Sequence, residues 1–281
     1  MRRLTRRSRH ALTACLLDLV SATLKVLPKS WVSRLGERFG QVVSLITRRQ
    51  SRLITTQMRL CLKNPPAPRL IWADLGRRLF ELMDAERQIS RVQIPEGCRE
   101  VFDEAREDGR GILLATLHLG NWELMAAALV QAGYRFKSIA SRPKNSPLYK
   151  RLSEQRRQLG VQIIRPGHGA RDAVAELKSG GTVSIFIDQN TGERSRNINF
   201  FGQSAPTPTT FERLQKTTNA IPMMVWNYRN MEGGYTVEVT RLDEDDPLAS
   251  ATKHAETLIR RYPTQWIWMH RRWRQDINRT R

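Results

Sequence analysis

The stretch GILLATLHLGNWEL, residues 111–124, decides how the rest of the chain is interpreted. Its apolar run GILLATL is typical of a buried β-strand, and the run ends at His118. Gly120 then permits a tight turn, and Asn121 is a good N-cap for a helix that carries Glu123 in its first turn. The stretch therefore predicts a strand, a turn and a helix, with a histidine at the carboxyl end of the strand.

His118 and Glu123 are candidates for a catalytic pair. Side chains five residues apart point away from each other in a regular helix, so these two meet only if the chain is not yet helical at His118. The turn at Gly120 allows this. A carboxylate beside an imidazole fixes its tautomer and makes the other ring nitrogen a better base. The spacing therefore predicts a His118–Glu123 dyad that deprotonates a hydroxyl.

The His-x4-acid spacing has little weight in isolation. With 5 histidines and 27 acidic residues in 281 positions, about one half of a match is expected by chance. Its position after a strand and before a capped helix is what favours a functional interpretation.

Beyond this stretch, short apolar runs alternate with amphipathic segments. Strands are predicted at 135–141, 161–166, 182–188, 221–229 and 235–242. Helices are predicted at 121–133, 146–160, 170–181, 209–220 and 250–263. This alternation predicts an α/β fold, a mixed, mostly parallel sheet flanked by helices. Ligands bind such sheets beyond the carboxyl ends of the strands, where His118 and Asp188 fall.

Residues 1–90 are predicted to form a helical N-terminal region, followed by an α/β domain at 91–281. Within the helical N-terminal region, the segment 11–28 is apolar but is interrupted by Asp18 and Lys25. Its polar positions recur at helical spacing and several arginines precede it, so we predict a helix that docks on the interface of a membrane. A packed helix of a soluble protein and a signal peptide are the alternatives, although Asp18 argues against the signal peptide.

The composition limits the choice of partner and compartment. Lys and Arg total 47 against 27 Asp and Glu, a net charge of +20, which predicts a polyanionic partner: nucleic acid, an anionic membrane or an acidic protein. The three cysteines, Cys15, Cys61 and Cys98, are scattered and form no CxxC motif. They indicate neither a zinc site nor a disulfide framework, and favour a reducing, cytoplasm-facing compartment.

Three further segments allow two interpretations each. The polar stretch 189–207 is predicted to be a long loop, either a substrate lid and acyl-chain entrance or a mobile surface loop. The basic segment around Arg142 is either a phosphate or carrier-protein contact or a solvated face. The segment QWIWMHRRW, 265–273, fits a membrane-interface belt or nucleic-acid stacking, and fits a packed C-terminal element equally well.

Four of these motifs together resemble one family. They are HLGNWE at 118–123, SRPKNSP at 141–147, DQN…NFFGQSAPTPT at 188–209 and PTQWIWMHRRW at 263–273. In order and approximate spacing they resemble the bacterial lipid A late acyltransferases, the lauroyl and myristoyl acyltransferases, within the His-x4-acid glycerolipid acyltransferase group. The resemblance covers most of the chain.

The resemblance implies an acyltransferase on the cytoplasmic face of the cell inner membrane. Such enzymes move a fatty acyl group from a thioester of acyl carrier protein or coenzyme A to a hydroxyl of a lipid A precursor or related glycolipid. The implied partners are an acidic acyl carrier protein, anionic membrane lipids and the glycolipid; no metal, bound cofactor or nucleic acid is implied. By motif, His118 is the general base and Glu123 its partner. The residues implied to bind substrate are Gly120, Asn121, Arg142, Asp188, Gln189, Phe201, Gly202, Thr207 and Thr209.

Two departures from the family pattern leave the acceptor open. The family's loop is usually acidic after its Asp-Gln pair, whereas here it reads DQNTGERSRN, and the N-terminal segment is more polar than a full membrane span. An aminolipid or a lysophospholipid is therefore an alternative acceptor. From other classes, the alternatives are a basic nucleic-acid-binding protein and a catalytically silent membrane scaffold.

Overall fold

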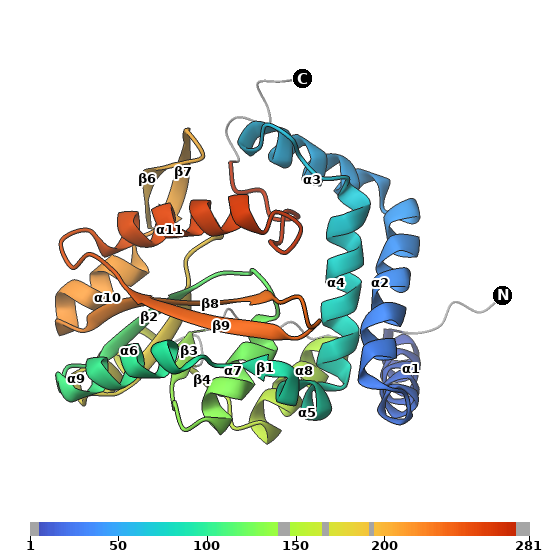
Figure 1. The fold of residues 1–281 in the computed structure, drawn as a ribbon, viewed down its shortest axis with the longest axis horizontal. Coiled ribbons are helices and arrows are strands. Elements are labelled where there is room, and N and C mark those ends of the chain that lie inside the picture. The colour runs from blue at the N-terminus through green and yellow to red at the C-terminus, as the bar shows by residue number, and fades with distance from the viewer. Residues whose placement is uncertain (1–5, 140–146, 165–168, 191–193, 274–281) are drawn as a thin grey trace.

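The computed structural model describes residues 6–139, 147–164, 169–190 and 194–273 (Figure 1). The N-terminal part is helical: α1 (Arg6–Val26), α2 (Lys29–Ile46), α3 (Arg48–Cys61), α4 (Pro68–Met83), α5 (Ala85–Gln88) and the 3-10 turn η1 (Ile89–Arg91). The strands are β1 (Val92–Gln93), β2 (Ile112–Thr116), β3 (Lys137–Ile139), β4 (Gln162–Ile164), β5 (Thr182–Phe186), β6 (Ser195–Phe200), β7 (Gln203–Pro208), β8 (Ile221–Arg229) and β9 (Tyr235–Arg241). The helices among them are α6 (Glu96–Glu107), α7 (Trp122–Gln131), α8 (Pro147–Gln158), α9 (Gly169–Lys178), α10 (Thr210–Thr218) and α11 (Pro247–Arg261).

Within the described ranges, seven strands form one sheet in the order β1-β9-β8-β2-β5-β3-β4. The pairs β8–β2, β2–β5, β5–β3 and β3–β4 are parallel, whereas β8 and β9 are antiparallel and β1 runs parallel to β9. This confirms the predicted α/β fold with a mixed, mostly parallel sheet. The parallel order places the carboxyl ends of β2 and β5 side by side.

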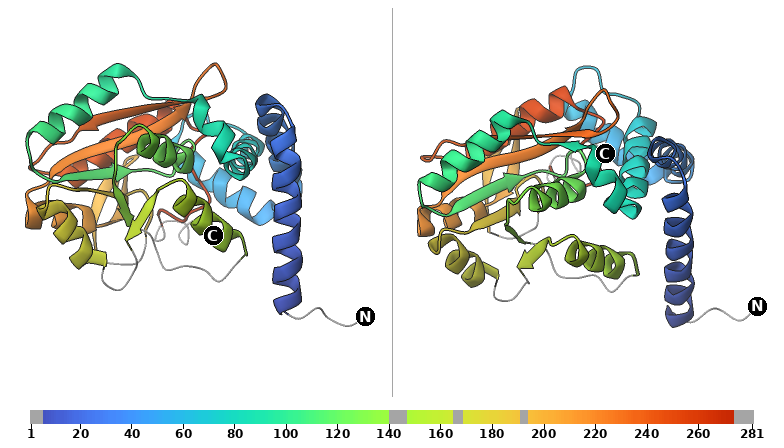
Figure 2. Two further views of the ribbon diagram at one scale, coloured as in Figure 1. Left: turned by 90° about the horizontal axis from the view of Figure 1, so that it is seen from below. Right: turned by 60° about the horizontal axis from the view of Figure 1, so that its bottom comes forward.

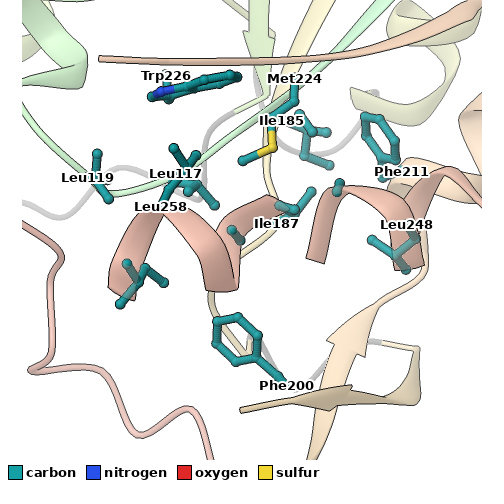
Figure 3. Close-up of a cluster of buried hydrophobic side chains, with 14 of the residues drawn as sticks. Leu117, Leu119, Ile185, Ile187, Phe200, Phe211, Met224, Trp226, Leu248 and Leu258 are labelled. Atoms are coloured by element: carbon teal, nitrogen blue, oxygen red, sulfur yellow. The ribbon is translucent and has the colours of Figure 1, made fainter. Parts of the chain in front are cut away.

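Helices cover both faces of the sheet. On one face, Ile185 and Met224 pack toward Leu248 and Leu258 of α11, as Figure 3 shows. On the other face, α6 and α7 pack against the sheet around Leu114. Strand β2 is buried along its whole length, which explains why its sequence is continuously apolar rather than alternating.

The predicted long loop at 189–207 is wrong, because β6 and β7 form an antiparallel hairpin there. Phe201 and Gly202 lie at its two-residue turn with φ of 58° and 76°. Such turns are usually signalled by Asn-Gly, since both central residues need positive φ. Because phenylalanine occupies the first of these two positions, the sequence does not predict the turn.

Helix α1 contains most of the segment predicted to dock on a membrane, and both views in Figure 2 show it at the edge of the molecule. Its inner side, including Leu24, packs with Met83 of α4, while Leu16 and Leu19 are exposed. Among the described residues, we find no helix with the length and apolarity needed to cross a bilayer.

Glycines bring α2 and α4 into backbone contact. A Cβ atom at Gly40 would lie 1.9 Å from the carbonyl oxygen of Trp72, and one at Gly76 would lie 2.2 Å from that of Gly36. Both positions have therefore no room for a side chain at this separation of the helix axes.

We expect Gly40→Ala to lower the free energy of unfolding by about 1–3 kcal/mol, because the added methyl group forces the two helices apart. Gly97→Ala in α6 is the matched control: the nearest atom to its added Cβ lies 4.0 Å away, so helix propensity should make it neutral or slightly stabilising. Thermal unfolding of both variants checks this, and an equal melting temperature for Gly40→Ala and the parent protein would contradict it.

Candidate active site

The stretch around His118 folds as its sequence predicts. β2 ends at Thr116, and α7 begins at Trp122 with Asn121 as its N-cap, whose side chain accepts a hydrogen bond from Leu124 N at 3.4 Å. Gly120 has φ of 61°, and a Cβ atom there would lie 2.1 Å from Oδ1 of Asn227. Glycine is thus required both by the turn and by the close neighbour.

The His118 imidazole is bound by a carboxylate, and that carboxylate is Asp188. His118 Nδ1 lies 2.8 Å from Asp188 Oδ1, and the backbone N–H of His118 donates to Oδ2 at 2.8 Å. Trp266 Nε1–H donates to the same Oδ2 at 2.8 Å. Asp188 follows β5 and is 3% exposed, so these partners hold it in one orientation beside the histidine.

Asp188 is held in its charged form. Burial raises the pKa of this carboxyl, but the charge of His118 and the hydrogen bonds from His118 and Trp266 outweigh burial and bring the pKa below its ordinary value of 3.8. Because the pKa falls on folding, the stabilisation from this charge is present above pH 3.8 and is lost as the pH drops through the lower folded value. Asp188 therefore remains a carboxylate throughout the neutral range.

The expected pairing of His118 with Glu123 is wrong in this structure, because Glu123 is bound by Arg156 of α8. Arg156 Nε donates to Glu123 Oε2 at 2.8 Å, a second guanidinium nitrogen donates to Oε1, and Trp122 Nε1–H donates to Oε1 at 3.1 Å. The first turn of α7 turns Glu123 toward α8, while the adjacent strand β5 supplies the partner of His118. Both His118 and Glu123 nevertheless line one cavity.

Aromatic rings fix the plane of the imidazole. The Phe186 ring stacks on His118 with centroids 4.1 Å apart, and the Trp122 ring meets it edge-on at 4.9 Å. Since Nδ1 is bonded to Asp188, Nε2 is the nitrogen that remains to exchange a proton with a substrate. The arrangement is that of a general base with an orienting carboxylate.

The cavity beside His118 has a volume of about 300 Å³. Its polar end is lined by His118, Glu123, Arg156 and Gln189. Its remaining lining is largely apolar, although Thr116, Ser138 and Ser184 also belong to it. The apolar members include Leu114, Met125, Ala126, Leu129, Phe136, Val161, Ile163 and Val225. A cavity of this kind accommodates a hydrocarbon chain and places its polar head at the histidine.

Among the residues implied to bind substrate, Gln189 lines this cavity, whereas Gly120 and Asn121 build the turn. Asn121 also accepts a hydrogen bond from Asn227 through its backbone carbonyl at 2.9 Å. Arg142 lies outside the described residues. Gly120 and Asn121 therefore shape the loop that carries His118.

The hairpin residues named by the resemblance are not among those described as lining the cavity. The Phe201 N–H donates to Glu256 Oε2 at 2.7 Å, and Gly202 sits at the exposed hairpin tip. Thr207 is buried and accepts from Arg272 Nη2 at 2.5 Å, and Thr209 donates to the Arg194 carbonyl at 3.2 Å. The described part of the cavity lining contains instead their neighbours Pro208 and Thr210.

The tryptophans of segment 265–273 belong to a packed C-terminal element. Trp266, Trp268 and Trp273 are all buried, and Trp273 stacks on Phe200 of β6 with centroids 5.5 Å apart. They hold the hairpin and Asp188 together rather than forming a belt on the surface.

Two arginines near the site carry no signal in the sequence. Arg156 of α8 contacts Glu123. The sequence of α8 resembles that of any basic surface helix, so it does not single out Arg156. Arg78 of α4 is buried, pairs with Asp74 at 2.8 Å and donates through Nη1 to the Gly120 carbonyl at 2.7 Å. Arg78 thus ties the N-terminal helices to the turn that carries His118.

Metal ligands do not cluster in the part of the chain that the structure describes: no group of three or more His, Cys, Asp or Glu side chains there could hold an ion.

Comparison with known proteins matches residues 3–275 to the family described as bacterial lipid A biosynthesis acyltransferase. A phosphatidylinositol mannoside acyltransferase of Mycobacterium tuberculosis is 26% identical over 204 residues, 69% of this chain but only 64% of that relative's length. A lipid A biosynthesis palmitoleoyltransferase of Escherichia coli is 24% identical over 268 residues, covering 88% of this chain and 86% of that protein. The crystal structure of a 1-acyl-sn-glycerophosphate acyltransferase from Thermotoga maritima aligns with a TM-score of 0.35 and 15% identity, covering 83% of this chain and 93% of that one.

Proposed function

The chain belongs to the bacterial lipid A biosynthesis acyltransferase family, and from that premise we propose that it transfers a fatty acyl group from a thioester to a hydroxyl of a glycolipid. The observation that carries the proposal is the His118–Asp188 pair at the polar end of an apolar cavity. The pair supplies a base for the hydroxyl, and the cavity supplies a site for the acyl chain.

The reaction follows from the roles of these groups. His118 Nε2 takes the proton of the acceptor hydroxyl as its oxygen attacks the thioester carbonyl. The tetrahedral intermediate collapses, the new ester forms, and the C–S bond breaks. The imidazolium returns the proton to the leaving thiolate, and Asp188 stabilises the imidazolium meanwhile. No covalent bond to the protein is formed.

Arg156 is the basic group that we assign to the developing oxyanion. It lines the same cavity as His118, and Glu123 orients its guanidinium through hydrogen bonds to Nε and a second nitrogen. A fixed cation next to the reacting carbonyl stabilises negative charge there at little reorganisation cost. In this proposal Glu123 acts through Arg156 and not through His118.

The acyl donor and acceptor follow from charge and from the relatives. A net charge of +20 complements an acidic acyl carrier protein, which we propose as donor, with coenzyme A as the alternative thioester. The relatives' names refer to lipid A and to phosphatidylinositol mannoside, which are glycolipids. We therefore propose a lipid A precursor or related glycolipid as acceptor, with an aminolipid or lysophospholipid as the alternative.

The proposed location is the cytoplasmic face of the inner membrane. Besides the segment 11–28, most of which lies in α1, we propose α2 as part of the docking surface. Large apolar side chains recur along it three or four residues apart and are exposed: Trp31, Leu35, Phe39, Val42 and Ile46. Exposed arginines lie on α2 and the start of α3: Arg34, Arg38, Arg48 and Arg49. Apolar anchors beside cations suit the interface of an anionic bilayer.

We expect Val42→Asp combined with Ile46→Asp to weaken binding to vesicles of phosphatidylethanolamine and phosphatidylglycerol by about tenfold or more, because both anchors are lost and charge repulsion is added. The two side chains are 60% and 79% exposed, so folding should be unaffected. Met231→Asp, at a fully exposed turn far along the chain, is the control. Cosedimentation measures both, and equal binding by the double variant and the control would contradict the assignment.

Acyl transfer itself is tested with purified protein, a bacterial membrane lipid extract and isotopically labelled acyl groups on either carrier protein or coenzyme A. We expect the label in an ester of a glycolipid with at least one donor. Folded protein that labels no lipid with either donor would overturn the proposed function.

A further inference from the structure

We propose that Phe136, with Leu114 and Leu129, forms the end wall of the acyl-chain site and so sets the longest chain that the protein accepts. The inference rests on the proposed acyl transfer. These residues lie away from His118, and they are the ones that line both the cavity beside His118 and a second, smaller cavity.

The sheet supplies a scale along the cavity. β2 and β5 are paired in parallel with Thr116 opposite Phe186, Leu114 opposite Ser184, and Ile112 opposite Thr182. Successive pairs on one face lie about 7 Å apart, since a strand rises about 3.3 Å per residue. The pair nearest His118 and the next pair line the main cavity, whereas the third pair lines a second cavity of about 10 Å³.

The two cavities share a wall. Leu114, Leu129 and Phe136 line both of them. Phe136 is buried and packs in the core between the sheet and α7. Behind the wall, the second cavity is lined by Phe102 and Tyr134 of the same core and by Arg106 and Arg135, which are exposed at the surface.

Helix α7 gives the same order of depth independently. Its first turn brings Trp122 and Glu123 to the polar end of the cavity, Ala126 lies one turn further on, and Leu129 lies at the wall. β2 runs in the opposite sense, from Ile112 at the second cavity to Thr116 near His118. The helix and the strand therefore place the wall at the end furthest from the catalytic histidine.

The chemistry fixes the direction of the acyl chain. The thioester carbonyl must lie at His118, so the methyl end extends along the apolar lining toward Phe136. Each methylene that is buried on the way improves binding by about fourfold. A chain that reaches the wall gains nothing from further carbons, because they meet the ring of Phe136 in a close-packed core.

Phe136→Ala opens the wall and joins the two cavities, so it should extend the accepted chain by about two to four carbons and raise the kcat/KM ratio of the longer donor to the parent optimum by about tenfold or more. Ala126→Leu narrows the site halfway and should shift the optimum to shorter chains. Phe102 lines the second cavity but not the cavity beside His118. Phe102→Ala should therefore leave the profile of accepted chain lengths unchanged.

The experiment offers each folded variant an equal mixture of saturated acyl thioesters that differ by two carbons, and the ester products are identified by mass spectrometry. Opposite shifts for Phe136→Ala and Ala126→Leu support the wall. Transfer by the parent protein with the same length profile in both variants would overturn it while leaving the proposed function intact. If Phe136→Ala does not fold, an unchanged chain-length profile in Ala126→Leu is sufficient to overturn the inference, and it leaves the proposed function intact. No transfer from any donor by the parent protein would overturn the proposed function and the wall with it.

Discussion

Replacement of His118 by alanine is expected to reduce kcat for acyl transfer by about 10²- to 10⁴-fold, the range over which a general base contributes. The side chain lies at the polar end of the cavity, and its Nδ1 is already committed to Asp188 at 2.8 Å. Without the ring, the acceptor hydroxyl has to give its proton to water. Binding of the acyl donor should change little, because the apolar lining is retained.

The control for this variant is His254→Ala. His254 lies on α11, where its Nδ1 is 3.0 Å from the Ser250 carbonyl, and it is absent from the described lining of the cavity. His254 is partly buried but lies away from the cavity, so its removal should leave kcat within about twofold of the parent value. Steady-state rates with matched circular dichroism spectra check both variants, and a His118→Ala protein with parental kcat would refute the role of the base.

Asp188→Asn is expected to reduce kcat by a similar factor, about 10²- to 10⁴-fold, although the amide has the same shape as the carboxylate. The amide removes the negative charge that stabilises the imidazolium, and its NH₂ group can favour the wrong tautomer of His118. The backbone N–H of His118 and Trp266 Nε1–H, which both donate to Oδ2, would keep the side chain in place. Stability at neutral pH should fall as well, because a hydrogen-bonded buried charge is lost.

The matched variant is Glu123→Gln. Comparing it with Asp188→Asn shows whether Asp188, as in the structure, or Glu123, as the sequence spacing predicted, is the carboxylate that binds His118. A hydrogen bond from Nδ1 to a carboxylate moves the proton resonance of that N–H far downfield. We expect Asp188→Asn to abolish the downfield signal of His118 and Glu123→Gln to retain it, since Glu123 is bound by Arg156. Loss of the signal in Glu123→Gln and its survival in Asp188→Asn would reverse the assignment.

The features that the sequence predicts correctly are local. The strand, turn and helix around His118 follow from an apolar run, one glycine and one N-cap within a few residues of each other. The alternation of strands and helices likewise gives the mixed, mostly parallel sheet. Each of these features depends on residues that are close together in the chain, so a short stretch of sequence is enough to predict it.

The features that the sequence misses depend on which elements become neighbours in space. His118 pairs with Asp188 because β5 lies beside β2 in the sheet, and no spacing along the chain records that adjacency. Arg156 and Arg78 reach the site from α8 and α4 for the same reason. The positive φ of Phe201 could not be anticipated, because a bulky residue rarely adopts it.

Mass spectrometry of lipid extracts tests whether the His118–Asp188 pair catalyses acyl transfer to a membrane glycolipid, as we propose. Cells that lack the gene are compared with cells complemented by the parent protein, His118→Ala or Asp188→Asn, at equal expression. We expect that one glycolipid loses the mass of a single acyl group on deletion and that the parent protein alone restores it. Equal restoration by His118→Ala, or an unchanged lipid profile on deletion, would contradict it.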